Sequence, residues 1–416
     1  MAIGDLIVGI DIGTSRVCCC LGQINKFNQV EILNSASCEC DGFKKGKYES
    51  TDAIARAIRF AISDIEGQYD FIIQSAYVNI LGKYVDVYST KYSVELIDKY
   101  AGVSQENIDD IIKGAATVSL PEDYQIIDVV PTRFITDTKV TDDPIGIFTK
   151  TLSAELDLLV AKKDIVKTIS SAMQKAGLKI DGIVANGFAI RDIVLDEEEL
   201  QNGVLLLDVG DGNIDISVFK ASNILYTDSI PVGGDTITND IALVLEISQD
   251  EAGKLKKQYG LSDRQYIEHD YSIKLNSYTG EEATNGYVKC SELVSIMEAR
   301  INEIFSIVYK SLKENNLVKE VKSCVISGTG FNSVNKVEKT AENILNIPVR
   351  FGNAKTANLI KPVCITSYGV VKYISNIKYT KNIGSRIQVD EEQSLFDSTI
   401  KNIKKAFSGA FNKNKK

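Results

Sequence analysis

The chain has 416 residues, of which 44% are hydrophobic and 25% are charged, and its formal net charge is −9. These proportions are those of a soluble globular protein of two to four domains, at roughly 100–200 residues each. The acidic balance argues against general nucleic-acid binding, no apolar run reaches the ~18 residues of a membrane-spanning helix, and no signal peptide precedes the first strand-like run.

The cysteine and histidine content argues against a metal site built from these residues. The eight cysteines contain no CxxC pair, several lie in strand-like runs, and the only histidine, His269, lies in a polar stretch. We therefore expect buried thiols in a reducing cytoplasm and a histidine at the surface.

Hydrophobic periodicity predicts that the first part of the chain is interrupted by an insertion. Up to about residue 80 the pattern is strand, hairpin, strand, and then a helix that begins at Ser50 or Thr51. Between residues 84 and 162 the pattern becomes that of a small α+β module. The segments expected are a helix at 51–65, strands at 69–81 and 84–90, a helix at 104–116, and strands at 124–135 and 152–160.

The rest of the chain repeats the strand-and-turn pattern of its beginning. After a helix at 165–176 and a strand at 180–185, a second half opens at Val204. The segments expected there are helices at 237–246 and 250–259, a long helix at 293–314, and a buried strand at 321–326. Globular sequence continues to about residue 379, and the polar segment 386–393 is expected to be a linker.

Three glycine turns follow strand-like runs. The first turn is Asp11-Ile12-Gly13-Thr14-Ser15, the second is Asp208-Val209-Gly210-Asp211-Gly212-Asn213, and the third is Ser327-Gly328-Thr329-Gly330. Tight glycine turns let backbone N–H groups approach phosphate oxygens, and an Asp at the strand end can hold Mg²⁺ through water. One such turn is also an ordinary strand ending, but the repetition favours two similar halves with a nucleotide between them.

The order of these turns, phosphate, phosphate and adenosine, resembles the nucleotide signature of the superfamily that joins actin, heat-shock chaperones and sugar kinases. Within it, nearly the whole chain resembles an FtsA-type bacterial cell-division protein. The segments that carry this resemblance are Asp11 to Val17, Asp142-Asp143-Pro144-Ile145-Gly146 with Leu152, Ile230 to Ala242, and Glu298-Ala299-Arg300 with Glu303.

The resemblance implies an α/β, actin-like ATPase fold of two duplicated halves with an inserted small α+β subdomain, 1C. It implies ATP with Mg²⁺ in the central cleft, filaments of this protein, and capture of the C-terminal peptide of the tubulin-like GTPase FtsZ on subdomain 2B. The expected location is the cytoplasmic face of the membrane at the division septum, with anionic lipids and other division-ring proteins as further partners.

The same resemblance sets the expected domain limits and site residues. The domains are 1A at 1–83 and 163–202, 1C at 84–162, 2A at 203–236, 2B at 237–320, a return through 2A to 1A at 321–385, a linker at 386–394 and a tail at 395–416. The nucleotide-binding residues are Asp11, Gly13, Thr14, Ser15, Arg16, Asp208, Gly210, Gly212, Asn213, Gly233, Gly234, Lys256, Gly328, Thr329 and Gly330, with Asp11 and Asp208 on Mg²⁺ through water.

Several positions depart from the family pattern and argue for slow or absent ATP hydrolysis. Asp211 brings a carboxylate towards the phosphates, and two like charges ~4 Å apart repel by roughly 1–4 kcal/mol. Asn186 stands where an acidic residue is usual, and a carboxamide cannot act as a general base. Gly253 replaces a Glu, for which Glu251 could substitute, and Thr329 and Phe331 stand where small residues are usual. A fully degenerate site is the alternative.

The C-terminal tail predicts a reversible membrane anchor. At about 100° per residue, an apolar stripe forms from Phe396, Ile400, Ile403, Phe407 and Phe411. Lys401 and Lys405 lie on the other side of the helix, with Lys404 at the border. An amphipathic helix of this kind beyond a flexible linker is typical of an interfacial anchor. The alternative is a helix docked on the protein's own core or on a partner.

Two rival functions share the three turns. A kinase that hydrolyses ATP needs a catalytic carboxylate, which Asn186 disfavours. A chaperone needs a large peptide-binding domain after the ATPase, which the short segment after Tyr379 disfavours. A pilus-assembly actin-like protein shares the inserted module but would not need a tail rich in Phe and Lys.

Overall fold

The computed structural model describes residues 6–25, 29–96, 102–275, 286–352 and 362–377. They form two compact units, of which the first joins the described residues of Met1–Val87 and Ile165–Lys378, and the second is Tyr88–Asp164. The expected linker and tail, 386–416, lie outside the described residues.

The first sheet of the larger unit has the order β11-β6-β1-β2-β3. Its strands are β1 (Leu6–Ile12), β2 (Arg16–Ile24), β3 (Val30–Glu39), β6 (Ser75–Ile80) and β11 (Lys179–Ala185). β2 runs antiparallel to both of its neighbours, β1 and β3, whereas β6 runs parallel to β1 and to β11. The carboxyl ends of β1, β6 and β11 therefore meet at one edge of the sheet.

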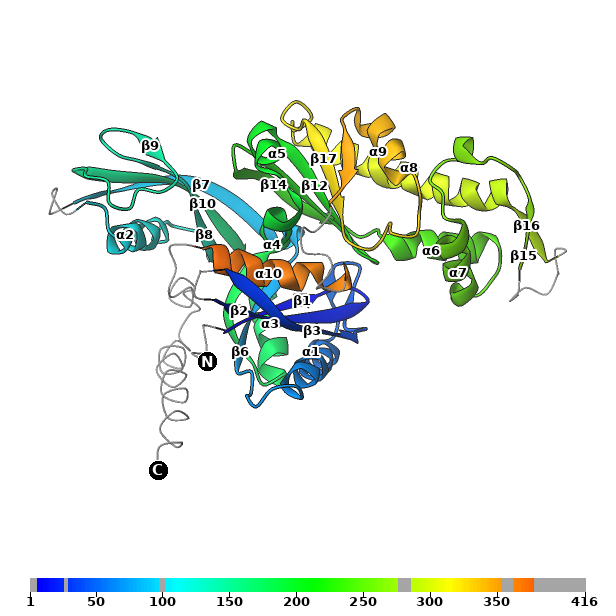
Figure 1. The fold of residues 1–416 in the computed structure, drawn as a ribbon, viewed down its shortest axis with the longest axis horizontal. Coiled ribbons are helices and arrows are strands. Elements are labelled where there is room, and N and C mark those ends of the chain that lie inside the picture. Colours follow the sequence, from blue (N-terminus) through cyan, green and yellow to red (C-terminus); the bar gives the residue numbers. More distant parts are fainter. Residues whose placement is uncertain (1–5, 26–28, 97–101, 276–285, 353–361, 378–416) are drawn as a thin grey trace. The chain divides into compact units, whose positions relative to one another are not determined.

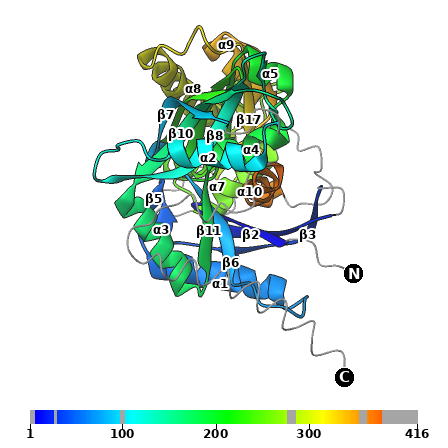
Figure 2. The same ribbon diagram turned by 90° about the vertical axis from the view of Figure 1, so that its left-hand side faces the viewer.

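Helices cover both faces of this sheet (Figure 1 and Figure 2). α1 (Thr51–Glu66) begins at Ser50, whose side chain accepts a hydrogen bond from the Ala53 N–H, and it buries an Ala- and Ile-rich face. α10 (Ile365–Asn376) packs on the opposite face, where a Cβ on Gly9 would lie 2.4 Å from the carbonyl oxygen of Ser367. The glycine thus allows the close approach of helix and strand.

The second sheet of the larger unit repeats the plan of the first. Its order is β14-β13-β12-β17-β18, with three antiparallel strands followed by two parallel additions. The strands are β12 (Val204–Val209), β13 (Ile214–Lys220), β14 (Asn223–Ile230), β17 (Ser323–Ser327) and β18 (Val349–Phe351). The equivalent position of the β1–β2 and β12–β13 hairpins shows the two duplicated halves.

One face of the second sheet shares a hydrophobic core with four helices. They are α6 (Gly234–Val244), α7 (Gln249–Tyr259), α8 (Cys290–Glu314) and α9 (Val337–Leu345), and a small hairpin of β15 (Ser272–Lys274) and β16 (Tyr287–Lys289) lies beside α8. The other face contacts α4 (Asn186–Val194) and α5 (Glu197–Asn202), and Phe188 meets Phe219 edge to face.

The smaller unit is a four-stranded sheet with the order β7-β10-β8-β9. Its strands are β7 (Val85–Glu95), which begins in the larger unit, β8 (Tyr124–Ile135), β9 (Val140–Thr141) and β10 (Thr151–Lys162). α2 (Gln105–Ala115) is held by a capping box at Ser104 and packs Ile108, Ile111 and Ile112 into the core of this unit.

Most of the elements expected from periodicity are present, with shifted ends. The expected strand at 69–81 is wrong in its first part, because β6 begins only at Ser75. Tyr69 instead stacks on Phe71, and the Ile73 N–H donates to the Glu66 carboxylate at 2.7 Å, which holds these residues in a loop after α1. The long helix is confirmed and begins at Cys290.

The helix expected at 165–176 is α3 (Lys163–Lys175). The remaining elements are short: the hairpin of β4 (Phe43–Lys44) and β5 (Lys47–Tyr48) and the 3-10 turns η1 (Gly82–Tyr84), η2 (Arg264–Tyr266) and η3 (Pro362–Cys364). None of the eight cysteines, all of which lie in the described ranges, forms a disulfide; seven are buried and Cys38 is half-buried, and His269 is exposed, as expected. None of the helices in the described ranges is long and apolar enough to cross a membrane.

Candidate functional site

Two hairpin turns define the candidate site. The Gly13 N–H donates to the Arg16 carbonyl at 3.0 Å, and the Gly210 N–H donates to the Asn213 carbonyl at 2.9 Å. A Cβ on either glycine would lie within 3.2 Å of the same carbonyl oxygen. Both turns therefore favour glycine, because any side chain would crowd the carbonyl oxygen that closes the turn.

The two turns face each other across the cleft between the halves. The Thr14 hydroxyl donates to Asn213 Oδ1 at 2.9 Å, and the Ser15 hydroxyl donates to Asp211 Oδ2 at 2.5 Å. A Cβ on Gly212 would lie 2.3 Å from the Thr14 methyl carbon. The Asp211 carboxylate is thus directed to the first turn, where a bound polyphosphate would have to replace these hydrogen bonds.

A cavity runs between these turns, and the sequence predicted most of its lining. The predicted residues that line it are Asp11, Gly13, Thr14, Ser15, Arg16, Asp208, Gly210, Asn213, Gly328 and Thr329. Asp211 and Asn186, two of the departures from the family pattern, also line it, and the structure adds Ile12, Leu81, Val209, Val363, Ile365 and Thr366. Segments far apart in the sequence therefore meet at one cavity, with the start of α10 as an unpredicted wall.

Five predicted residues do not line the cavity but support it. Gly233 and Gly234 lie at the start of α6, and the Gly234 N–H donates to the Gly210 carbonyl at 3.0 Å. The Gly330 N–H donates to the Val209 carbonyl at 2.8 Å, and Gly212 packs on Thr14. Gly234 and Gly330 therefore hold α6 and the third turn against the second turn, and Gly212 packs the second turn on the first.

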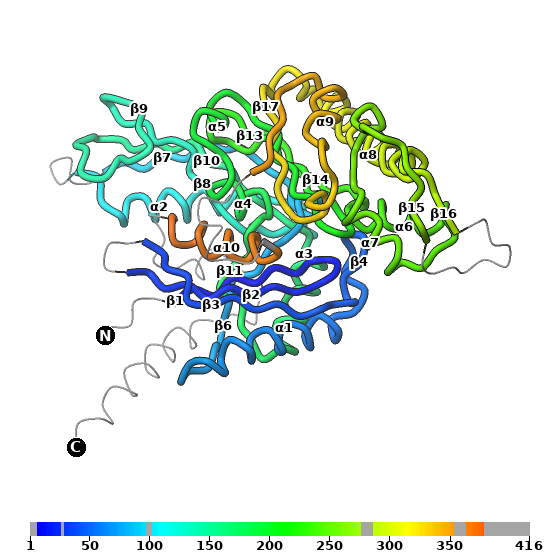
Figure 3. Tube along the Cα trace, turned by 45° about the vertical axis from the view of Figure 1, so that its right-hand side comes forward, coloured from blue at the N-terminus to red at the C-terminus, as the bar shows by residue number. Residues whose placement is uncertain are grey.

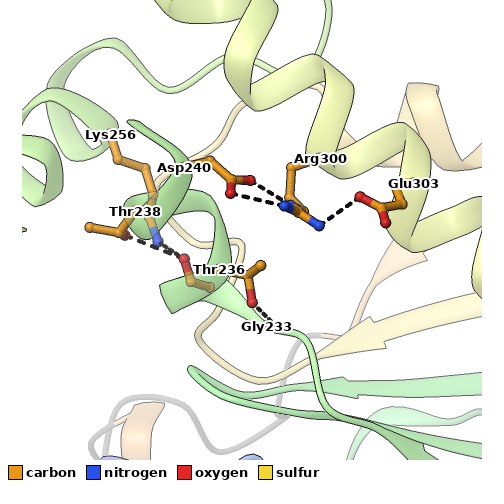
Figure 4. A network of polar contacts seen from close by, with 8 residues as sticks. Gly233, Thr236, Thr238, Asp240, Lys256, Arg300 and Glu303 are labelled. Carbon is orange, nitrogen blue, oxygen red and sulfur yellow. Dashed lines mark hydrogen bonds and ion pairs between the residues drawn. The ribbon is translucent and has the colours of Figure 1, made fainter. Parts of the chain in front are cut away.

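Lys256, the fifth, reaches the start of α6 from α7. Its ammonium group donates to the Gly234 carbonyl at 2.7 Å, and the Thr238 hydroxyl donates to the same oxygen at 3.3 Å (Figure 4). Burial lowers the pKa of Lys256, while Asp235 and Asp211 act in the opposite sense. The lysine therefore braces α6 and carries a positive charge near the second turn.

The sequence missed Asn79, which is buried next to the residues that line the cavity. Asn79 Oδ1 accepts the Ile12 N–H at 2.8 Å, and its amide group donates to Asp11 at 2.6 Å and to Asn186 at 2.8 Å. The Asn186 amide group in turn lies 3.5 Å from Asp208. Two carboxamides therefore connect the carboxylates of the two halves. A polar residue near the end of an apolar strand was the one available signal.

Three carboxylates lie at or beside the site: Asp11 and Asp208 are half-buried, and Asp215 is buried. Burial, with the neighbouring Asp208 next in effect, raises the pKa of Asp11 well above its usual value, and burial raises the pKa of Asp208 to about 6. Burial also raises the pKa of Asp215 to about 8, although hydrogen bonds from Ser229 and Gly82 oppose the shift. A divalent cation would compensate such charges.

The third turn supports the second through its backbone. Gly328 has a φ of 86°, and a Cβ there would lie 2.3 Å from the Val209 carbonyl oxygen. Phe331, expected among the unusual residues of the adenosine turn, is buried and packs on Phe305 at 5.9 Å between ring centroids. It serves the core of the second half. Glu251 is also buried, at the beginning of α7.

Comparison with known proteins identifies the family. The family model described as Cell division protein FtsA matches residues 205–369, and the model of the SHS2 domain inserted in FTSA matches residues 82–160. Cell division protein FtsA of Neisseria meningitidis serogroup B is 30% identical over 345 residues, which are 82% of this chain and 82% of that protein. The chain belongs to the FtsA family of cell-division proteins.

More distant relatives agree with this assignment. FtsA of Bacillus subtilis is 27% identical over 370 residues, which are 89% of this chain and 83% of that protein. Among solved structures, the PilM-PilN type IV pilus biogenesis complex aligns with a TM-score of 0.57 at 14% identity, over 88% of this chain and 98% of that one. MreB5 of Spiroplasma citri bound to ADP aligns with a TM-score of 0.52 at 13% identity, over 89% of this chain and 97% of that one. These likenesses show the actin-like fold, and with the SHS2 match they confirm the expected fold class of this FtsA-family chain.

Proposed function

We propose that this FtsA-family chain is an ATP-binding adaptor of the division ring that polymerises and tethers FtsZ to the cytoplasmic membrane. The observation that carries the proposal is the pair of glycine turns that face each other beside the half-buried carboxylates of Asp11 and Asp208. FtsA identity supports the division role, and the solved MreB5 structure with ADP is a precedent for nucleotide in this fold.

The residues present fit ATP with Mg²⁺. Among the described residues, the backbone N–H groups of Thr14, Ser15, Asp211 and Gly212 donate to no other residue, so both turns offer free donors. Asp11 and Asp208 supply oxygen ligands of the kind that Mg²⁺ prefers. The metal would neutralise phosphate charge, and Asn79 would hold the Asp11 carboxylate in place. Gly328 and Thr329 would approach the nucleoside.

The side chains near the cavity support slow or absent hydrolysis. Asn186 lines the cavity in the place of an acid, and its carboxamide cannot take a proton from water. Asp215 does not line the cavity, and its carboxylate already accepts hydrogen bonds from the Gly82 N–H and the Ser229 hydroxyl. The nucleotide would therefore act chiefly as a conformational ligand.

The tail supports membrane attachment through its sequence. Burial of its five large apolar side chains would contribute up to roughly 10 kcal/mol, and each Lys near anionic lipid about 1 kcal/mol. Ordering the segment costs ~1 kcal/mol or more per residue before helical hydrogen bonds offset it. One tail would bind marginally and a filament of tails firmly, so polymerisation and attachment would be coupled. The FtsZ C-terminal peptide would bind subdomain 2B, for which FtsA identity is the support.

Calorimetry with ATP and Mg²⁺ tests the nucleotide part of the proposal. We expect a binding signal that Gly328→Asp abolishes, because the new carboxylate would fall against Asp208. Gly67→Asp is the matched control, since Gly67 is exposed at the end of α1 with a φ of −62°. Undetectable binding at millimolar ATP would overturn ATP binding, and turnover near 1 s⁻¹ or faster, the usual enzyme range, would overturn slow hydrolysis.

A further inference from the structure

A small hairpin in the larger unit concentrates lysines against the local preferences of the chain. β4 and β5 pair Phe43 with Tyr48 and Lys44 with Lys47, so two like charges lie directly opposite each other. The two-residue turn is Lys45-Gly46, with φ values of 47° and 73°. Such turns favour Asn-Gly or Asp-Gly, because a side chain as long as that of Lys is strained at a positive φ.

The hairpin is nevertheless rigidly held. Phe43 is fully buried, and its ring lies 4.8 Å from that of Tyr48. The Tyr84 hydroxyl donates to the Gly46 carbonyl at 2.6 Å. The contacts of Phe43, Tyr48 and Tyr84 thus stabilise a hairpin whose turn residues and like charges are locally unfavourable. Locally unfavourable features that a protein retains in this way often mark functional sites.

A fourth lysine extends the charged surface. A Cβ on Gly46 would lie 2.6 Å from Lys83 Nζ, which itself lies 4.9 Å from the centroid of the Tyr84 ring. Burial lowers the pKa of Lys83, and Lys47 adds to the effect. None of the four lysines has an ion pair within the part of the chain that the structure describes. We call Phe43–Tyr48 together with Lys83 the lysine hairpin; β4 is labelled in Figure 3.

The smaller unit carries the opposite charge. Tyr88–Asp164 contains fourteen acidic and eight basic residues, a net charge of −6 out of −9 for the whole chain. Residues 137–148, which join β8 to β10 and are called here the acidic connection, combine exposed acids with exposed large apolar residues. The acids are Asp137, Asp142 and Asp143, and the apolar residues are Val140, Ile145 and Phe148, which are 59%, 46% and 63% exposed.

The acidic connection is also rigidly held. The Gly146 N–H donates to the Val103 carbonyl at 2.8 Å, and the Val103 N–H donates to the Ile147 carbonyl at 2.9 Å. Asp143 accepts the Ile145 N–H at 3.2 Å, and Asp137 accepts the Lys150 N–H at 2.8 Å. Three acids and three apolar side chains are therefore presented on a fixed surface, which limits the entropy that binding would cost.

We propose that the lysine hairpin of one copy of this chain binds the acidic connection of the next copy. The two surfaces differ, so the contact is heterologous and repeats from copy to copy without using up either surface, as a filament requires. Charge complementarity would guide the encounter and fix the register, and the apolar residues would supply the buried contact. The inference rests on the proposed self-assembly and names the surfaces that carry it.

Neutralisation of the hairpin separates this role from a structural one. In Lys44→Gln, Lys45→Asn, Lys47→Gln the charge repulsion is removed and the turn becomes Asn-Gly, so the melting temperature should rise. Assembly of the full chain with Mg-ATP, followed by light scattering and electron microscopy, should show a critical concentration at least tenfold higher. The matched control is Lys310→Gln, Lys313→Gln, Lys319→Gln, which makes the same charge change on exposed sites of α8 and the loop after it. It should assemble as the unmodified chain does.

Charge exchange tests the pairing itself. Lys44→Glu, Lys47→Glu should abolish assembly, and Asp142→Lys, Asp143→Lys added in the same chain should restore it to within a fewfold. Glu106→Lys, Asp110→Lys on α2 makes the same charge change and should not restore it. Equal rescue by both pairs, or unimpaired assembly of the hairpin variants, would overturn the inference and leave the proposed function standing.

Two further outcomes distinguish other failures. If the unmodified chain forms no polymers, the proposed self-assembly fails and the inference fails with it. If the hairpin variants assemble normally but lose binding to vesicles of phosphatidylglycerol and phosphatidylcholine, the hairpin binds lipid headgroups and the inference is overturned. Polymers of the unmodified chain should also weaken as salt rises, more steeply than those of the neutralised variant, because salt screens the paired charges.

Discussion

Asp215 is a single residue that joins the two halves of the larger unit. It lies in β13 directly opposite Asp208, and its carboxylate accepts the Gly82 N–H at 3.0 and 3.2 Å and the Ser229 hydroxyl. Gly82 follows β6 of the first half, and a Cβ there would lie 2.2 Å from the Thr227 hydroxyl oxygen. The contact therefore fixes the segment that leads into the inserted unit.

The pKa of Asp215 predicts a pH dependence of stability. Because burial raises the folded-state pKa to about 8, the folded chain keeps a proton that the unfolded chain has lost above the ordinary carboxyl pKa of 3.8. This contribution to stability is complete below the unfolded pKa and is lost as pH rises towards about 8. Asp208, with a pKa of about 6, adds a smaller loss at lower pH.

Asp215→Asn should remove most of this dependence. One pKa unit is worth ~1.4 kcal/mol, and the folded pKa of about 8 already includes the hydrogen bonds to the charged form. Between pH 5 and pH 9 the unmodified chain should therefore lose roughly 4 kcal/mol of stability that the variant does not lose. Urea denaturation at both pH values measures this, with Asp64→Asn on the exposed side of α1 as the control. Parallel pH profiles for the unmodified chain and Asp215→Asn would contradict the assignment.

Arg350 connects β18 to α4 and α5, the helices on the face of the second sheet that is opposite α8 and α9. Its guanidinium group donates to both Glu199 oxygens at 2.7 and 2.6 Å and to the Val194 carbonyl at 2.7 Å. Arg350→Ala should lower the free energy of unfolding by about 1–2 kcal/mol, a figure that allows for its partial exposure. Lys310→Ala, whose ion pair with Glu314 spans 3.8 Å on the surface, is the control and should cost about 0.5 kcal/mol or less. Equal losses would show that the Arg350 contacts add nothing.

The tail is the second element with a decisive test. If the Phe stripe inserts into lipid, Phe407→Glu should release the full chain from anionic vesicles while its melting temperature stays unchanged, because an anchor beyond a linker adds nothing to the core. Ser408→Glu, on the polar side, is the matched control and should retain most binding. A tail docked on the protein core predicts the reverse, a loss of several kcal/mol of stability with lipid binding unchanged.

At the scale of the whole molecule, the inserted unit should serve assembly and leave nucleotide binding intact. It has its own core, built from α2 and three strands, and the cavity lining contains none of its residues. Replacement of residues 88–164 by a short Gly-Ser linker should therefore leave the calorimetric ATP signal within about threefold and abolish polymers in electron micrographs. The Gly-Ser linker inserted in front of residue 88 without deletion controls for the junction. Polymers of the deleted chain would refute the role in assembly.

The sequence by itself predicted the features that depend on neighbouring residues. The turns at Gly13, Gly210 and Gly328 were found because a strand followed by a tight turn leaves a local pattern. α1 was predicted to begin at Ser50 or Thr51 because capping and periodicity are local too, and the structure selects Ser50 as the cap. The repetition of these patterns indicated two similar halves, the resemblance to the FtsA family implied the actin-like fold, and the comparisons confirm that fold.

Only the tertiary structure decided which of these residues meet. Asn79 and Asn186 connect Asp11 to Asp208 because β6 and β11 run parallel beside β1, and strand pairing of this kind leaves no mark in the spacing of the sequence. The register of a two-residue turn places Lys44 directly opposite Lys47, so two like charges face each other. Phe331 entered the core because helix α8 lies over it, which no local pattern states. In each case contacts between residues far apart in the sequence decided the outcome, and local patterns carry no information about such contacts.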